Sequence, residues 1–155
     1  MKGTFIISLD FELLWGLAGW NLQQINSYKS HIDGSRRALK GLLEILERYE
    51  VKCTIGYVGG MDYTSVEEFK HVNVEKKPMY KEPMFSSYRS LVPHIGKEFS
   101  EELFFCKDVI ASLVKNMNVE LGSHTFSHYY CLEEGQIIEE FEADNASGNF
   151  INIFW

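Results

Sequence analysis

The chain has 155 residues, of which 45% are hydrophobic and 14% aromatic, and it carries a net charge of −7 at neutral pH. This length and composition predict one globular domain with a single core, and they exclude a low-complexity chain. The negative charge argues against a nucleic-acid or anionic-membrane partner, since either would require a basic face.

The first apolar run and the cysteines bear on the compartment. Residues 4–9 are apolar but are followed directly by Asp10, so the run is too short for a signal-peptide core or a membrane span. The three cysteines, Cys53, Cys106 and Cys131, are an odd number without metal-binding spacing. We therefore expect a reduced, cytoplasmic protein.

The first half of the chain alternates β-prone and helical patterns. Residues 4–9 predict a buried strand, and residues 11–32, which lack a period, predict a long loop. Residues 33–49 carry an apolar stripe opposite charged positions, which predicts a helix with Asp33 as its N-cap. Residues 51–58 predict a second strand that ends at a glycine pair.

The second half repeats this alternation after an irregular stretch. Residues 64–70 predict a short helix, and residues 71–99 hold all three prolines and no clear period, as functional lids often do. A long helix is predicted for residues 101–117, a third strand for 119–121 and a last helix for 133–143. The alternation predicts a parallel sheet, whose active site would lie at the carboxyl ends of the strands.

Two groups of chemically active side chains directly follow predicted strands. Asp10 and Glu12 follow the first strand, and His124 and His128 follow the third. We expect all four on one rim of the sheet, with the two histidines on one turn of helix so that both imidazoles point the same way. Zinc and similar ions accept carboxylates and neutral imidazoles. We therefore predict a divalent-metal site with His124, His128 and Glu12 as ligands, and Asp10 as the general base toward metal-bound water.

Each of these assignments has a structural alternative. Two histidines four residues apart are, on spacing alone, more often a surface or packing pair, and an acid after a strand is often a turn former. Glu12 could be an exposed loop acid, Trp15 a core anchor and Cys131 a small buried hydrophobe. Phe126 and the pair Tyr129–Tyr130 are expected to be packing residues, although an aromatic pair beside a site could hold a sugar ring. The presence of both groups at strand ends favours the metal site.

Two motifs resemble those of a known family. The segments Ile7-Ser8-Leu9-Asp10-Phe11-Glu12 and Gly122-Ser123-His124-Thr125-Phe126-Ser127-His128 resemble the first two motifs of the polysaccharide deacetylases, the NodB-homology domain of carbohydrate esterase family 4. The resemblance implies an α/β fold, a distorted (β/α) seven-stranded barrel. It also implies a hydrolase that removes N-acetyl or O-acetyl groups from sugars with zinc or a similar divalent ion.

The resemblance also implies roles for individual residues. His124 and His128 match the metal-binding histidines, and Asp10 matches the catalytic base. The usual second acid of the first motif is replaced by Phe11, which cannot bind a metal, and Glu12 fits the variant whose acid lies one residue further on. The third metal ligand is therefore expected to be Glu12.

The chain departs from the family pattern near residue 145. The family continues through further strands with an arginine-containing motif and a late histidine that serves as general acid, and a full eightfold barrel takes about 250 residues. We therefore expect a partial domain, truncated or altered near residue 145. A half-barrel leaves sheet edges unpaired, which predicts low stability or pairing with a second copy or a partner chain.

The sequence thus favours a metal-dependent carbohydrate deacetylase acting on carbon–nitrogen, non-peptide bonds of N-acetylated sugars. Its expected partner is an acetylated carbohydrate of polysaccharide metabolism. The alternative is a catalytically incompetent half-domain that retains only metal or sugar binding, or that needs a partner chain.

Overall fold

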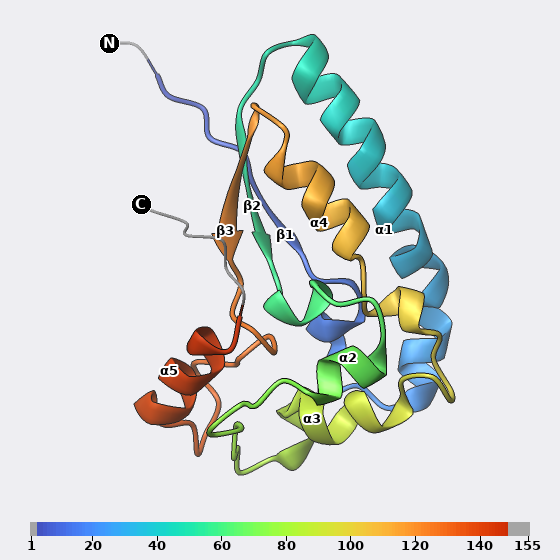
Figure 1. Ribbon diagram of the computed structural model, residues 1–155, viewed down its shortest axis with the longest axis vertical. Helices are drawn as coiled ribbons and strands as arrows, with labels where there is room; N and C mark the ends of the chain where they lie inside the picture. Colours follow the sequence, from blue (N-terminus) through green and yellow to red (C-terminus); the bar gives the residue numbers. More distant parts are fainter. Residues whose placement is uncertain (1–2, 149–155) are drawn as a thin grey trace.

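The computed structural model describes residues 3–148 and contains a small parallel sheet (Figure 1). Strands β1 (Ser8–Phe11), β2 (Cys53–Tyr57) and β3 (Val119–Ser123) pair in the order β1-β2-β3. The predicted parallel sheet is confirmed. The predicted seven-stranded barrel is wrong: the described residues form three strands and the sheet is open, because no later strand returns to pair with the free edge of β1.

The strands begin and end a few residues from their predicted bounds. β1 begins at Ser8 rather than at residue 4: Ser8 pairs with Thr54, the second residue of β2, so β2 extends only one residue beyond this pair. Phe5 and Ile6 therefore extend past the sheet and are exposed. β3 is longer than predicted and ends at Ser123, which pairs with the last residue of β2.

Helix α1 (Leu22–Arg48) begins well before its predicted start. Its N-cap is Asn21 and not Asp33: the Asn21 side chain accepts a hydrogen bond from the Gln24 amide, and the Gln24 side chain accepts one from the Asn21 amide, each at 2.9 Å. The prediction of a loop through residue 32 failed because the first half of the helix contains fewer apolar residues than the second and gives a sparse apolar signal, although each half buries two residues. The buried stripe of the whole helix consists of Ile25, Ile32, Leu39 and Leu46.

The helices after β2 are shorter than predicted, except for α2 (Val66–Lys70), which is confirmed. Helix α4 (Lys107–Val114) covers only part of the predicted helix, because Phe104, Phe105 and Cys106 are buried in succession, which one helical face does not allow. The segment 71–99 contains α3 (Ser87–Ser90) and two 3₁₀ turns.

The last helix, α5 (Ile138–Ala146), begins and ends later than predicted. The departure expected near residue 145 falls at the end of this helix. Residues 149–155 lie outside the described part of the chain.

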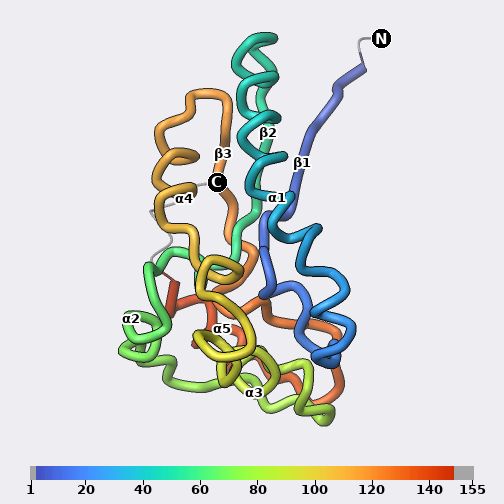
Figure 2. The backbone as a smooth tube through the Cα atoms, turned by 90° about the vertical axis from the view of Figure 1, so that its right-hand side faces the viewer, coloured from blue at the N-terminus to red at the C-terminus, as the bar shows by residue number. Residues whose placement is uncertain are grey.

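The helices cover one face of the sheet and the ends of its strands. Helices α1 and α4 lie on the same face, and α2, α3 and α5 lie beyond the carboxyl ends of the strands (Figures 1 and 2). The covered face presents apolar residues such as Ile55 and Leu121, whereas the opposite face presents small and polar ones such as Asp10, Gly56 and Glu120. The hydrophobic core continues beyond the carboxyl ends of the strands.

Trp15 anchors that core, as the structural alternative predicted. Its side chain is fully buried, and its Nε1 donates a hydrogen bond to the Phe104 carbonyl oxygen at 3.0 Å. Trp15 belongs to the 3₁₀ turn Leu13–Leu17, directly after Glu12. The core therefore fixes the segment that carries one of the predicted metal ligands.

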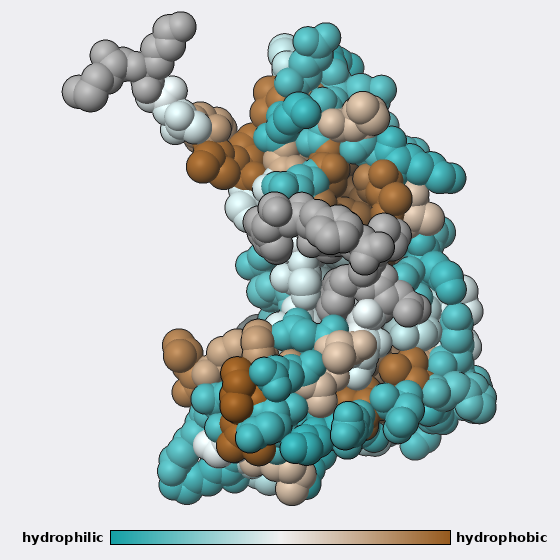
Figure 3. Space-filling view, turned by 60° about the vertical axis from the view of Figure 1, so that its left-hand side comes forward, coloured by the Kyte–Doolittle hydropathy of each residue, from teal (hydrophilic) through white to brown (hydrophobic). Residues whose placement is uncertain are grey.

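Apolar surface gathers at the amino ends of the strands (Figure 3). There Phe5, Ile6 and Met117 are exposed and line a cleft of about 390 Å³. This cleft lies at the opposite end of the sheet from the predicted site. Within residues 3–148, no helix has both the length and the apolar character needed to cross a membrane.

The cap of α1 gives a test of the corrected helix start. Asn21→Ala should lower the free energy of unfolding by about 1 kcal/mol, because the Gln24 amide in the first turn loses its side-chain acceptor. The same substitution at Asn26, which is exposed in the second turn, should leave stability unchanged or slightly higher, since alanine has the higher helix propensity. Denaturant unfolding of both variants measures the difference; equal effects would contradict the assigned N-cap.

Candidate metal centre

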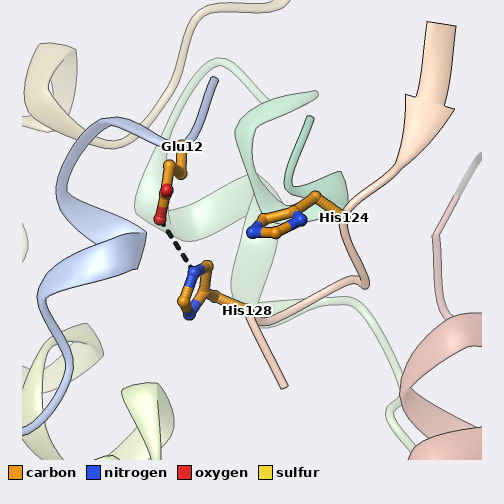
Figure 4. Close-up of side chains that lie close together, drawn as sticks. All are labelled: Glu12, His124 and His128. Atoms are coloured by element: carbon orange, nitrogen blue, oxygen red, sulfur yellow. Dashed lines mark ion pairs between the residues drawn. The ribbon is translucent and has the colours of Figure 1, made fainter. Parts of the chain in front are cut away.

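The four predicted residues lie together at the carboxyl ends of β1 and β3. One donor atom each of Glu12, His124 and His128 lies within 4.8 Å of the others, and all three side chains face a common space (Figure 4). His128 Nε2 lies 2.8 Å from Glu12 Oε2. His124 Nδ1 lies 3.9 Å from Asp10 Oδ1. The structure thus brings the two ends of the chain to one site that could hold a metal ion.

The two histidines are presented by a loop and not by the predicted turn of helix. Thr125 and His128 have φ angles of 61° and 60°, in the left-handed region that residues other than glycine rarely adopt. The loop begins at the end of β3, where the His124 amide donates to the Tyr57 carbonyl oxygen at 2.9 Å. Both imidazoles reach the same space because of the left-handed backbone at Thr125 and His128, not because they share a helical face.

The glycine pair after β2 supports this loop by direct backbone contact. The Gly59 amide donates to the Thr125 carbonyl oxygen at 2.9 Å, and the Gly60 amide donates to the Phe126 carbonyl oxygen at 2.7 Å. A Cβ at Gly60 would lie 2.8 Å from the Trp15 ring and 3.1 Å from the Phe126 oxygen. Only glycine therefore lets the loop lie this close to β2 and to the core.

Phe126 is fully buried in that core, which confirms its assignment as a packing residue. The expectation that Cys131 is a small buried hydrophobe is wrong, because its side chain is exposed. It lies beyond the loop, where the chain has left the core.

Glu12 is held as a carboxylate by its neighbours. The hydrogen bond from His128 lowers the pKa of the Glu12 carboxyl, and the nearby charges of His128 and His124 act in the same direction, although partial burial opposes them. Its side chain is 30% exposed, so solvent still reaches it. Glu12 is thus an anion at neutral pH at the centre of the group, as a metal ligand must be.

The donor set and its spacing fit a divalent metal ion. In a tetrahedral zinc site with bonds of about 2.0–2.1 Å, neighbouring ligand atoms lie roughly 3.3 Å apart. The Glu12–His128 distance of 2.8 Å is slightly shorter than this, and the remaining donor separations lie within 4.8 Å. Small rotations of these side chains would close the group around an ion. Two imidazoles and one carboxylate leave a fourth position for water.

Asp10 stands beside the group on the open face of the sheet. Its side chain is 57% exposed, and its strand partner is Gly56, which in turn pairs with Gly122. A Cβ at Gly56 would lie 3.2 Å from Asp10 Oδ1 and 3.6 Å from the His124 Cβ. The two glycines therefore leave space next to the Asp10 carboxylate, where water or a substrate can approach.

Tyr130 joins the histidine loop to the segment that carries Glu12. Its ring centroid lies 4.9 Å from that of His128, and its hydroxyl donates to the carbonyl oxygens of Gly16 and Ala18 at 3.4 and 3.2 Å. Burial raises the pKa of Tyr130 to about 12, so the hydroxyl remains a donor. The sequence predicted packing for Tyr130, with stacking on a sugar ring as the alternative, and it carried no signal for hydrogen-bond partners more than a hundred residues away.

Asp144 on α5 is a second contact that sequence reasoning missed. Its carboxylate is completely buried and accepts hydrogen bonds from the Phe126 and Ser127 amides at 2.8 and 3.1 Å and from the Ser127 hydroxyl. Burial raises the pKa of Asp144, while these hydrogen bonds and His128 act in the opposite direction. An acid on a charged helix predicts an exposed position, so no sequence signal marked it.

Comparison of the chain with protein-family models, with curated proteins and with solved structures found no match. The deacetylase resemblance therefore rests on the two sequence motifs, and family membership stays a prediction. The geometry of the metal centre is independent of that resemblance.

Gly16 allows a test of the position of Glu12. A Cβ at Gly16 would overlap the Glu12 carboxylate, while the backbone of Gly16 lies outside the left-handed region and accepts alanine. Gly16→Ala should therefore displace this carboxylate and weaken zinc binding by about 10- to 100-fold. Isothermal titration with zinc measures the change.

The matched control is Gly34→Ala on α1, where an added Cβ meets no atom within 4 Å. This variant should keep wild-type zinc affinity and gain about 1 kcal/mol in stability from its helix propensity. Wild-type affinity in Gly16→Ala would contradict Glu12 as a ligand.

The lowered pKa of Glu12 also predicts a pH dependence in the metal-free protein. A carboxyl whose pKa is depressed in the folded state contributes stability above its ordinary value of 4.5, and this contribution is lost as pH falls through the folded value. Glu12→Gln keeps an acceptor for His128 but does not titrate. The difference in unfolding free energy between wild type and Glu12→Gln should therefore shrink on acidification; parallel pH curves would show that Glu12 has no such coupling.

Proposed function

We propose that this chain is a metal-dependent carbohydrate deacetylase, a hydrolase acting on the carbon–nitrogen, non-peptide bond of N-acetylated sugars. The observation that carries the proposal is the convergence of Glu12, His124 and His128 next to the exposed carboxylate of Asp10. Acids and histidines that only stabilise the fold do not need an exposed carboxylate beside them. Amide hydrolysis requires a base placed beside a metal-bound water.

Glu12, His124 and His128 would hold a divalent metal, most simply zinc. The metal would supply a Lewis acid for the acetyl carbonyl and a water molecule of lowered pKa. Asp10 would accept a proton as this water attacks the carbonyl carbon. The carbon–nitrogen bond then breaks, and the products are acetate and a free amino sugar.

Asp10 is also the group best placed to protonate the leaving nitrogen. The buried acids of α5 serve other purposes: Asp144 binds the histidine loop, and Glu140 accepts a hydrogen bond from the Met79 amide at 3.1 Å. Asp10, by contrast, is more than half exposed and borders the space left by Gly56. The proton taken from water by Asp10 would therefore be passed to the amine.

The open face of the sheet suits a sugar substrate. Next to Asp10 it presents the glycines of β2 and β3, and further along it presents the pair Thr54 and Glu120, whose side chains are joined by a hydrogen bond of 2.8 Å. A face of small and polar side chains offers both space and hydrogen-bonding groups to hydroxyl-rich molecules.

A second candidate function is metal binding without turnover. It is favoured by the position of Asp10, whose contact with His124 is 3.9 Å, too long for a hydrogen bond. In this case the chain would bind a metal or sugar, or would act only together with a partner chain. The two candidates differ in activity and not in metal affinity.

The experiment that tests the proposal combines zinc titration with an acetate-release assay on N-acetylglucosamine oligomers. His124→Ala should abolish stoichiometric zinc binding, because one of three ligands is lost. His71→Ala, an exposed histidine that ends α2, is the matched control and should bind zinc like wild type. Equal zinc affinity of wild type and His124→Ala would refute the site.

Asp10→Asn separates binding from chemistry. This variant should retain zinc binding while acetate release falls by about 10²- to 10⁴-fold, because the base is removed. Zinc binding without acetate release in the wild type would support the second candidate. Acetate release that survives Asp10→Asn would show that another group acts as base.

A further inference from the structure

We propose that Asp144 is the positioning residue of the metal centre: it fixes the conformation of the 124–128 loop that presents both imidazoles. This inference deepens the proposed function and rests on it for the metal. It concerns a residue outside both sequence motifs and outside the group of candidate ligands.

The contacts of Asp144 cover the middle of the loop. One carboxylate oxygen accepts from the Phe126 amide at 2.8 Å and from the Ser127 amide at 3.1 Å, and the other accepts from the Ser127 hydroxyl. Together these three donors satisfy the carboxylate within a buried environment. Asp144 thereby replaces the backbone partners that a helix or strand would have given to these amides.

The loop needs such a partner because of its backbone conformation. Phe126 and Ser127 lie between Thr125 and His128, the two residues in the left-handed region. For residues other than glycine this region is disfavoured, and it persists only where the surroundings impose it. Asp144 binds the amides of the two residues between Thr125 and His128. It therefore fixes both left-handed conformations and, with them, the directions of both imidazole rings.

Other contacts bind oxygen atoms of the loop but not the amides of Phe126 and Ser127. Thr125 Oγ1 accepts from the Tyr129 amide at 2.6 Å, and the Ser87 hydroxyl donates to the Ser127 carbonyl oxygen at 3.0 Å. Without Asp144, the amides of Phe126 and Ser127 would be buried donors without an acceptor. Such groups are costly, so the loop would rearrange to reach water.

A matched acid on the same helix separates positioning from stability. Glu140 lies one turn before Asp144, is also buried, and accepts a hydrogen bond from the Met79 amide of the 71–99 segment. Glu140→Ala and Asp144→Ala each remove a buried acid and its contacts. Only Asp144→Ala removes a contact to the histidine loop.

The test compares zinc affinity and the visible absorption of the cobalt-substituted protein in these variants. Asp144→Ala should weaken zinc binding by about 10- to 100-fold and alter the cobalt bands, since misplaced ligands change the coordination geometry. Asp144→Asn should restore most of the affinity, because its amide oxygen still accepts from both backbone amides and its amino group can donate to the Ser127 hydroxyl. Glu140→Ala should bind zinc within about twofold of wild type.

Wild-type affinity in Asp144→Ala, or an equal loss in Glu140→Ala, would overturn the proposal. If Asp144→Ala does not fold, Ser127→Ala decides, with Ser90→Ala as its control, because the Ser90 hydroxyl is also buried and bonded to a carbonyl oxygen at 3.1 Å. Ser127→Ala should weaken zinc binding and Ser90→Ala should not; equal affinities would count against Asp144.

Amide hydrogen exchange in the metal-free protein keeps the two proposals separate. The Phe126 and Ser127 amides should exchange faster in Asp144→Ala than in Glu140→Ala. Absence of zinc affinity in the wild-type chain would refute the proposed function. The role of Asp144 in the loop would still be tested by exchange: equal exchange rates in Asp144→Ala and Glu140→Ala would refute it.

Discussion

Parallel pairing of the three strands sets Asp10, Gly56 and Gly122 in one row across the sheet. Because side chains alternate between faces along a strand, this register decides that Asp10 lies on the open face and that Ile55 and Leu121 lie on the covered one. A slip of β1 by one residue would move Asp10 to the apolar side. Gly56 beside Asp10, and Gly122 beside Gly56, then leave the space in which the three candidate ligands and the base meet.

The three candidate metal ligands lie on two segments that are held by the core and not by a helix or strand. Glu12 is fixed because Trp15, three residues later, is fully buried and hydrogen-bonded to Phe104. The histidines are fixed because buried groups bind the loop between them: the Gly60 amide bonds to the Phe126 carbonyl oxygen, and Asp144 accepts from the Phe126 amide. Tyr130 connects the two segments. The geometry of the site is therefore a property of tertiary packing, and this packing is contributed by residues from both ends of the described chain.

Sequence reasoning reached the parts of this arrangement that follow from strand order. Apolar runs that end in Asp10 and in His124 predict parallel strands with functional carboxyl ends, and the structure places these residues together. It failed where long-range contacts override local pattern: α1 begins at Leu22 although its first half contains fewer apolar residues than its second, and the consecutive burial of Phe104, Phe105 and Cys106 interrupts a regular helical pattern. Asp144 was beyond its reach, because burial of an acid depends on donors supplied by a loop that is itself not predicted.

The barrel expected from the family resemblance is not needed to bring the three candidate metal ligands together. These ligands come from the ends of β1 and β3, and β2 lies between them, so three strands are sufficient to bring Glu12 and the two histidines together. A closed barrel would add walls around Asp10 and thereby exclude water, which strengthens electrostatic interactions in a site. In the open sheet Asp10 is more than half exposed. Metal affinity should therefore depend mainly on the loop and on Glu12, whereas the rate of hydrolysis should depend on what covers the open face when a substrate is bound.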